Sequence, residues 1–310
     1  MTLPRLALSV IGDEIGPSLD EMISFAHEQG LKRLDMRTVN GRNLLAMKKE
    51  EVIGISRRLE QAGLSVPAFV SPMFKWQAPG KSANGGKVDF AFDPGQCPAG
   101  NLVKHAIEIA VILGAPHMRI FSYLRYDGFR PEHMAALSDD LAKLLGLAGH
   151  YDITLQLENE PVCNIGNIAE LANFFTPREE PAREIVEDEE EDFDKHDNTQ
   201  SKQIYLRPLI DIANAWSTGE QPSDADIATL APLTTAIHLK DRDLAAGLTV
   251  PLGEGDVPWV AELGRLLRGV EAKEVLASIE THCPADGRNA TALSVANLRR
   301  IASEIGANIV

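Results

Sequence analysis

Short apolar segments alternate with longer amphipathic segments along this chain of 310 residues. The first segment, LALSV at residues 6–10, is apolar at nearly every position, as expected of a strand that is covered on both faces. A helical pattern follows over residues 17–29 and stops at Gly30, a residue that suits the end of a helix. The same two-part pattern recurs to the end of the sequence.

Eight strands are predicted in this way, at residues 6–10, 33–38, 64–70, 117–122, 153–159, 204–212, 235–240 and 275–281. The helices predicted to follow them span residues 17–29, 47–62, 101–113, 131–148, 168–175, 224–231, 259–267 and 290–305. Strands that are separated by helices pair in parallel, and eight such units indicate a closed (β/α)8 TIM barrel that forms one domain over residues 1–310. An open doubly wound sheet is the alternative, but no glycine-rich dinucleotide loop follows the first strand.

Two segments interrupt this pattern. Residues 177–200, before the sixth strand, carry 11 acidic and three basic side chains. We expect them to form a solvated, flexible insertion on the rim of the barrel, with a lid or an oligomer contact as the alternative. Residues 71–100 are rich in glycine and proline and follow the third strand, so they are predicted to lie over the catalytic face.

The overall composition narrows the classes of function. The formal net charge is −15, which disfavours broad contact with nucleic acid or with an anionic membrane surface. No apolar run approaches the length of a membrane span, and no signal-peptide pattern opens the sequence. The three cysteines (Cys97, Cys163 and Cys283) match no zinc motif and indicate reduced thiols in a cytoplasmic protein.

Four of the predicted strands end in polar side chains that suit a metal site: Glu158, Asp211, His238 and Glu280. Active sites of barrels lie at these strand ends, and ionisable groups at such depth are costly unless they are paired or bind a metal. A set of three carboxylates and one imidazole suits Mn²⁺, Mg²⁺, Co²⁺ or Zn²⁺. A surface ion pair or a loop cap would explain any one of these residues, but not readily all four.

Cationic side chains follow the same strand ends. Lys240 and His282 lie two residues beyond His238 and Glu280, so strand periodicity places each pair on one side. Arg37, Lys75 and Arg119 follow strands two, three and four. These cations predict either an anionic group on the substrate, such as a phosphate or a carboxylate, or pairing with neighbouring carboxylates.

With these residues in place, the sequence resembles the sugar phosphate isomerase/epimerase family, also described as xylose isomerase-like TIM barrels. The resemblance covers the chain apart from the acidic insertion, and it rests on seven motifs: LENEP, DIANAW, IHLKD, GEGDVPW, SIETH, IGDEIG and RIFS. Some relatives carry a histidine where this chain has Glu160. The branch of DNA-repair endonucleases needs more histidine ligands than these strand ends supply.

The resemblance implies one divalent ion bound by Glu158, Asp211, His238 and Glu280, with Glu158 and Glu280 also acting as an acid/base pair on the substrate. It further implies a substrate-binding role for Lys240, Arg119, Lys75, Arg37, His282 and, in GEGDVPW, Glu254. The expected reaction is isomerisation or epimerisation of a keto-sugar or a related polyhydroxy carbonyl compound through an enediolate.

Two alternatives to this reaction stay open: a metal-dependent dehydratase of the inosose dehydratase kind, and a sugar-binding protein without turnover. The expected partner is a small sugar. Barrels of this kind often pair, and the sequence leaves the choice between a monomer and a homodimer open.

Overall fold

The protein is described by a computed structural model that covers residues 2–85, 92–129, 133–176, 205–283 and 285–310. Seven parallel strands form one sheet in the order β1-β11-β8-β7-β6-β5-β4. They are β1 (Arg5–Val10), β4 (Ala68–Phe69), β5 (His117–Ile120), β6 (Thr154–Glu158), β7 (Leu206–Asp211), β8 (Ala236–Leu239) and β11 (Glu274–Ile279).

The predicted second strand closes the ring between β1 and β4. Residues 33–36 make isolated parallel bridges on both sides, Ile11 with Asp35 and Met36 with Phe69. The prediction of a TIM barrel is therefore confirmed, although strands two and three are shorter than the predicted 33–38 and 64–70. Pro67 lies within the predicted third strand and has no N–H to donate to a ladder, which accounts for part of this shortening.

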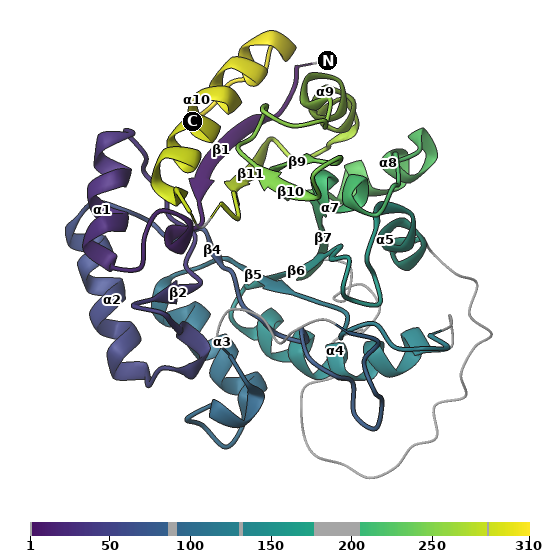
Figure 1. Cartoon of the computed structure of the whole chain (residues 1–310). Coiled ribbons are helices and arrows are strands. Elements are labelled where there is room, and N and C mark those ends of the chain that lie inside the picture. Colours follow the sequence, from purple (N-terminus) through teal and green to yellow (C-terminus); the bar gives the residue numbers. More distant parts are fainter. Residues whose placement is uncertain (1, 86–91, 130–132, 177–204, 284) are drawn as a thin grey trace.

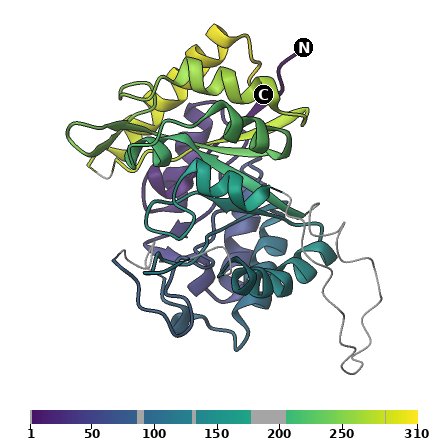
Figure 2. The same ribbon diagram turned by 90° about the vertical axis from the view of Figure 1, so that its right-hand side faces the viewer.

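Helices surround the strands in Figures 1 and 2. They are α1 (Leu19–Glu28), α2 (Lys49–Gln61), α3 (Leu102–Leu113), α4 (His133–His150), α5 (Ile168–Phe175), α8 (Asp224–Leu230), α9 (Trp259–Gly269) and α10 (Gly287–Ile305). Local sequence sets several of their ends. Ser18 and Glu21 form a reciprocal capping box at α1, and α3 ends at Gly114, whose φ of 66° is left-handed.

Smaller elements lie between these units and were not predicted. They are the helix α7 (Ile212–Ser217), the hairpin of β2 (Thr38–Val39) with β3 (Arg42–Asn43), and the hairpin of β9 (Asp241–Asp243) with β10 (Leu248–Val250). Four 3-10 turns complete the description: Gly12–Glu14, Leu44–Ala46, Pro94–Gln96 and Ala231–Leu233.

Apolar side chains form separate cores outside and inside the barrel. The larger cluster joins strand residues such as Leu6 and Leu8 to the helices, while Ile11, Leu209, Ala236 and Leu276 belong to a small separate cluster. The outer cluster holds the helices on the sheet, since burial of apolar area is the main favourable contribution to folding.

Strand register converts this inner core into a polar site toward the carboxyl ends. Ala236 pairs with both Leu209 and Leu276, which gives an apolar layer across three neighbouring strands. Two residues further on, His238 pairs with Asp211 and Ser278. Because successive inward positions differ by two residues, Lys240 and Glu280 form the next layer. The polar and charged side chains of the site therefore lie directly above a layer of apolar side chains inside the barrel.

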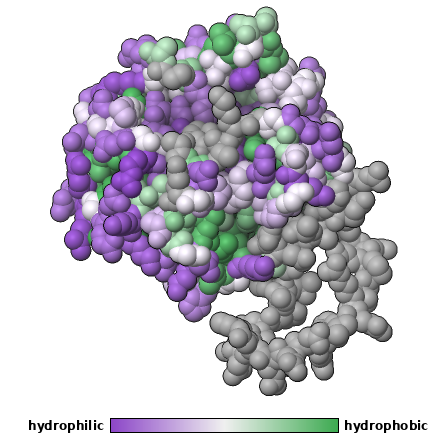
Figure 3. All heavy atoms as spheres, turned by 60° about the horizontal axis from the view of Figure 1, so that its bottom comes forward, coloured by the Kyte–Doolittle hydropathy of each residue, from purple (hydrophilic) through white to green (hydrophobic). Residues whose placement is uncertain are grey.

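The face shown in Figure 3 is mostly hydrophilic, and its hydrophobic residues form small separate patches. Among the described helices, none is long and apolar enough to cross a membrane. The predicted acidic insertion at 177–200 lies outside the described residues.

Candidate metal centre and active site

The four residues predicted as metal ligands lie together at the mouth of the barrel. Glu158 ends β6, Asp211 ends β7, His238 lies in β8 and Glu280 directly follows β11. Their potential ligand atoms all lie within 4.8 Å of one another, and each residue is at most 3% exposed. Three carboxylates and one imidazole at this spacing fit a divalent cation, and buried carboxylates at such density require positive charge nearby.

His238 lies between the two glutamates. Its Nδ1 atom is 3.2 Å from Glu158 Oε1 and 3.3 Å from Glu280 Oε2. Burial lowers the pKa of His238, but Glu158 and Glu280 outweigh it and raise the pKa to about 9. Burial raises the pKa of Glu158, and the positive charges of His238 and Arg119 more than offset this, giving a pKa of about 2. Glu158 is thus held ionised.

Asp211 uses its two carboxylate oxygens differently. Oδ1 accepts a hydrogen bond of 2.8 Å from the backbone N–H of Asn214 and so caps α7, whereas Oδ2 faces the Lys240 ammonium at 2.7 Å. The Asn159 side chain fixes the Asp211 backbone on both sides, accepting from its N–H at 2.9 Å and donating to its carbonyl at 2.8 Å. The sequence did not predict this role of Asn159. The one available signal was its position directly after Glu158.

Two buried cations lie against the carboxylates of this cluster. Lys240 Nζ is also 3.0 Å from Glu280 Oε2. Arg119 Nη1 lies 3.2 Å from Glu158 Oε2 and 3.3 Å from Glu280 Oε1, so it links the two glutamates from across the barrel. Burial raises the pKa of Glu280, but Lys240 and the two histidines hold that pKa well below its usual range.

Two further predicted cations lie beside this group. Arg37 Nη1 is 3.1 Å from Glu280 Oε1, and its Nε lies 3.0 Å from Asp13 Oδ1. Lys75 Nζ lies 2.9 Å from Glu160 Oε2. Each of the four predicted cations (Arg37, Lys75, Arg119 and Lys240) therefore has a carboxylate partner, which is the second of the two arrangements that the sequence left open.

His282 contacts Glu280 from the other side. It adopts a left-handed backbone with φ of 49°, and its side chain is 34% exposed. Nε2 lies 3.5 Å from Glu280 Oε1 and Nδ1 lies 3.2 Å from Glu14 Oε1. Burial lowers the pKa of His282, but the carboxylates of Glu280 and Glu14 outweigh it and raise the pKa to about 9.

The segment 71–76 borders the site, as expected for part of the loop after the third strand. Its backbone runs beside the end of β5, where the N–H of Phe121 donates to the Met73 carbonyl at 2.9 Å. The Phe121 ring lies under two cations, with Lys75 Nζ 4.8 Å and Arg119 Cζ 4.6 Å from its centroid. The ring thus lies between Lys75 and Arg119, the arginine that contacts Glu158 and Glu280.

The GEGDVPW loop is organised by Asp241. Its Oδ2 accepts from the N–H of Gly253 at 2.9 Å and its Oδ1 from the N–H of Val257 at 3.2 Å. A Cβ on Gly255 would lie 2.4 Å from Asp241 Oδ1, so the loop needs glycine there. This turn directs Glu254 outward, where it is exposed and accepts from Asn297 Nδ2 at 3.1 Å. Glu254 therefore lies outside the group of Glu158, Asp211, His238 and Glu280, and its predicted role in substrate binding stays a prediction.

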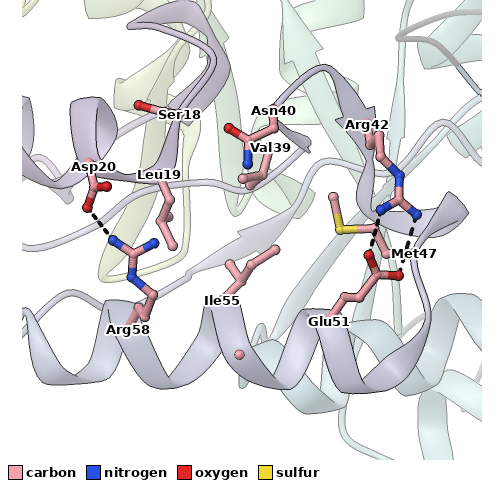
Figure 4. A pocket seen from close by; sticks show the side chains of 11 residues that line it. Ser18, Leu19, Asp20, Val39, Asn40, Arg42, Met47, Glu51, Ile55 and Arg58 are labelled. Atoms are coloured by element: carbon pink, nitrogen blue, oxygen red, sulfur yellow. Dashed lines mark hydrogen bonds and ion pairs between the residues drawn. The ribbon is translucent and has the colours of Figure 1, made fainter.

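A cavity of about 350 Å³ lies apart from this site, between α1, α2 and the β2–β3 hairpin (Figure 4). Its apolar lining includes Leu19 and Ile55, and the ion pair of Arg42 with Glu51 lies at one end. The residues that line it include none of the four predicted metal ligands.

The family model of xylose isomerase-like TIM barrels matches residues 23–301. The chain belongs to this family. Its members include sugar isomerases, epimerases and related enzymes, which supports an enzyme. No curated protein matches the sequence at a significant level.

Several solved structures share the fold at low sequence identity. The IOLI protein with a bound zinc atom is 14% identical, with a TM-score of 0.69 over 96% of this chain and 99% of that one. L-ribulose 3-epimerase is 13% identical, with a TM-score of 0.63 over 99% and 95%. The probable 3-DHS dehydratase AsbF of Bacillus anthracis is 15% identical, with a TM-score of 0.62 over 95% and 98%.

Proposed function

We propose that this protein is a divalent-metal-dependent isomerase or epimerase that acts on a keto-sugar or a related polyhydroxy carbonyl compound. One observation carries the proposal. Glu158 and Glu280, from strands that are not neighbours in the sheet, both approach His238 Nδ1 within 3.3 Å. Two ionised carboxylates therefore flank a single point in a buried site. The fold shared with L-ribulose 3-epimerase supports this class of reaction.

The ligands of the metal would be Glu158, Asp211, His238 and Glu280. A bound divalent ion would polarise the carbonyl group of the substrate and thereby acidify the adjacent C–H bond. The zinc atom in the related IOLI structure supports a metal in this family, and the oxygen-rich donor set of this chain also suits Mn²⁺ or Mg²⁺.

The two glutamates would move the proton. One carboxylate would remove it from the carbon next to the carbonyl, and the enediolate would then accept a proton again. Delivery of a proton from the opposite glutamate, which must then carry one when the substrate is bound, inverts the carbon and gives an epimer, whereas transfer on one face gives an aldose or ketose isomer. Lys240 and Arg119, which contact both sides of Glu280, would place N–H groups near the oxygens that gain negative charge.

Proton exchange tests this role directly. The Mn²⁺-loaded protein would be incubated in deuterated water with a panel of unphosphorylated ketopentoses and ketohexoses, and deuterium uptake followed by mass spectrometry. We expect exchange in the wild type and a loss of at least about a hundredfold in Glu280→Gln, since general-base catalysis contributes that much. Glu262→Gln is the matched control, because Glu262 is a glutamate on α9 that forms an ion pair with Arg265 and whose side chain is 11% exposed. Exchange by Glu280→Gln at the wild-type rate would remove Glu280 from the base role.

Dehydration is the second candidate. It is favoured by His282, whose Nε2 lies 3.5 Å from Glu280 and whose side chain is partly exposed, so it could protonate a leaving hydroxyl. The similar fold of the probable dehydratase AsbF agrees with this reading. In the same assay, a product lighter by one water would indicate dehydration, and stoichiometric metal and sugar binding without any exchange would indicate a binding protein.

A further inference from the structure

The IGDEIG motif near the start of the chain is not explained by the metal site. Glu14 of this motif lies in the 3-10 turn after β1 and is 8% exposed. Its carboxylate lies against four donor groups. Oε1 accepts from Arg37 Nη2 at 2.5 Å and lies 3.2 Å from His282 Nδ1. Oε2 accepts from the hydroxyl of Thr281 at 3.1 Å and from the backbone N–H of His282 at 2.7 Å.

Packing fixes Glu14 as firmly as its hydrogen bonds do. The first residue of α10, Gly287, lies directly against the Glu14 carbonyl, and a Cβ at this position would be 2.2 Å from that oxygen. The turn that carries Glu14 is therefore held between β1 and the start of α10. These contacts hold the Glu14 carboxylate against Arg37, Thr281 and His282.

The same contacts determine the conformation of His282. Its left-handed φ of 49° is uncommon for a residue other than glycine and has an energetic cost. The two hydrogen bonds that Glu14 Oε2 accepts from the Thr281 hydroxyl and the His282 backbone N–H offset this cost, and Oε1 fixes the ring. With Nδ1 directed at Glu14, Nε2 is directed at Glu280 Oε1, 3.5 Å away.

The group of Glu14, Glu280 and His282 has the spacing of a second cation site, but Arg37 already provides its positive charge. The guanidinium lies 2.5 Å from Glu14 Oε1 and 3.1 Å from Glu280 Oε1, so it bridges the two carboxylates. A role in positioning a side chain fits this arrangement better than a role as a ligand.

We infer that Glu14 is a positioning residue of the active site, which holds the His282 ring so that Nε2 faces Glu280 and the substrate beside it. The part of this inference that concerns substrate rests on the proposed function. The orientation of the ring does not. Carboxylates that orient a functional imidazole through its second nitrogen typically contribute ten- to hundredfold to activity or metal affinity.

A spectroscopic test needs no substrate. Imidazole ¹⁵N–¹H correlation spectra would be recorded on the full chain loaded with Zn²⁺, and the His282 signals identified by their absence in His282→Gln. We expect a hydrogen-bonded Nδ1–H in the wild type and shifted or lost His282 signals in Glu14→Gln, because an amide N–H would face the donors on one side of residue 14 whichever way the amide turns. Thr281→Val removes a different donor to Glu14 and should keep the Nδ1–H signal. Identical His282 signals in Glu14→Gln and the wild type would overturn the inference.

A double-mutant cycle on deuterium exchange then tests the route of action. If Glu14 acts through His282, Glu14→Gln should lower kcat by roughly ten- to hundredfold with little change in KM, and Glu14→Gln/His282→Gln should be no slower than His282→Gln. Rate losses that multiply in the double variant would overturn the inference. Absence of exchange in every variant, including the wild type, would count against the proposed function and leave the spectroscopic result to decide on Glu14. Should Glu14→Gln not fold, Glu14→Asp keeps the charge beside Arg37 and withdraws the carboxylate from the ring by one methylene, and both readouts apply to it.

Discussion

The carboxylate of Asp211 and the ammonium of Lys240 lie 2.7 Å apart at the barrel mouth, and neither side chain is more than 3% exposed. Burial lowers the pKa of Lys240, but Asp211 and Glu280 outweigh it and raise the pKa above its usual range, so the lysine stays charged. The ammonium therefore lies against oxygens that are proposed to bind the metal. Lys240 and a bound metal ion would therefore compete for the carboxylates of Asp211 and Glu280.

Replacing Lys240 by Met should tighten metal binding, because a like charge next to the cation is removed. We expect the affinity for Mn²⁺, measured by calorimetry, to rise by about tenfold, equivalent to about 1.4 kcal/mol. The metal-free variant should lose about 3–5 kcal/mol of unfolding free energy, because the buried Asp211 carboxylate loses its ion-pair partner and Glu280 loses one of several. Lys75→Met, which removes a cation paired with Glu160, should leave Mn²⁺ affinity nearly unchanged. Weaker Mn²⁺ binding by Lys240→Met would contradict this competition.

Asp35 should make the metal-free protein less stable as the pH rises. It is fully buried, beside the hydroxyls of Ser278 and Ser9. Burial raises its pKa to about 6 and outweighs the opposing effects of the Ser278 hydroxyl, the positive charge of His238 and the Ser9 hydroxyl. A folded-state pKa above the unfolded value means that its stability contribution is complete below about pH 4 and is lost as the pH rises through 6.

The matching variant is Asp35→Asn, which cannot ionise. The unfolding free energy of Asp35→Asn minus that of the wild type, measured in urea with a chelator, should be higher at pH 8 than at pH 4 by about 3 kcal/mol. Asp20→Asn, at a side chain that is 82% exposed, should show no such difference. A pH-independent effect of Asp35→Asn would show that Asp35 does not carry the raised pKa.

Asn159 should be needed for the geometry of Asp211. Asn159→Ala removes both side-chain hydrogen bonds to the Asp211 backbone, in a position that is 0% exposed. We expect a loss of about 2–3 kcal/mol in unfolding free energy and roughly tenfold in Mn²⁺ affinity. Asn297→Ala also removes two side-chain hydrogen bonds, but on α10, and should leave Mn²⁺ affinity intact. Equal Mn²⁺ affinity in the two variants would remove Asn159 from this role.

Two glycine-to-alanine substitutions should act in opposite directions. In Gly255→Ala the new Cβ would lie 2.4 Å from both Asp241 Oδ1 and the Arg242 carbonyl, so the loop must shift at a cost of roughly 3 kcal/mol or more. Gly54 lies within α2 with no atom near the position of a Cβ, so Gly54→Ala should stabilise the protein by about 1 kcal/mol. Thermal unfolding of both variants measures these effects, and a neutral Gly255→Ala would show that Asp241 does not require this close approach.

The regular part of the fold could be read from local pattern. The helix predicted at 168–175 is observed as α5 with the same bounds, and the predicted barrel is observed. The β9–β10 hairpin and the short helix α7 were not predicted, because a few residues carry too little periodicity to indicate an element. The second and third strands were predicted, but their shortening was not, since ladder pairing depends on neighbours that are distant in sequence.

The sequence by itself determined which residues stand at the strand ends, because the two-residue period of a strand and the closure of a barrel place Glu158, Asp211, His238 and Glu280 at one mouth. Only the tertiary structure decided how they are used. The contact of Glu14 with the backbone of His282 joins residues 268 positions apart, and the pairing of Arg37 with Glu280 joins residues 243 positions apart. Such contacts depend on ring closure between β1 and β11 and on the angle of each loop. Local residue pattern contains neither of these.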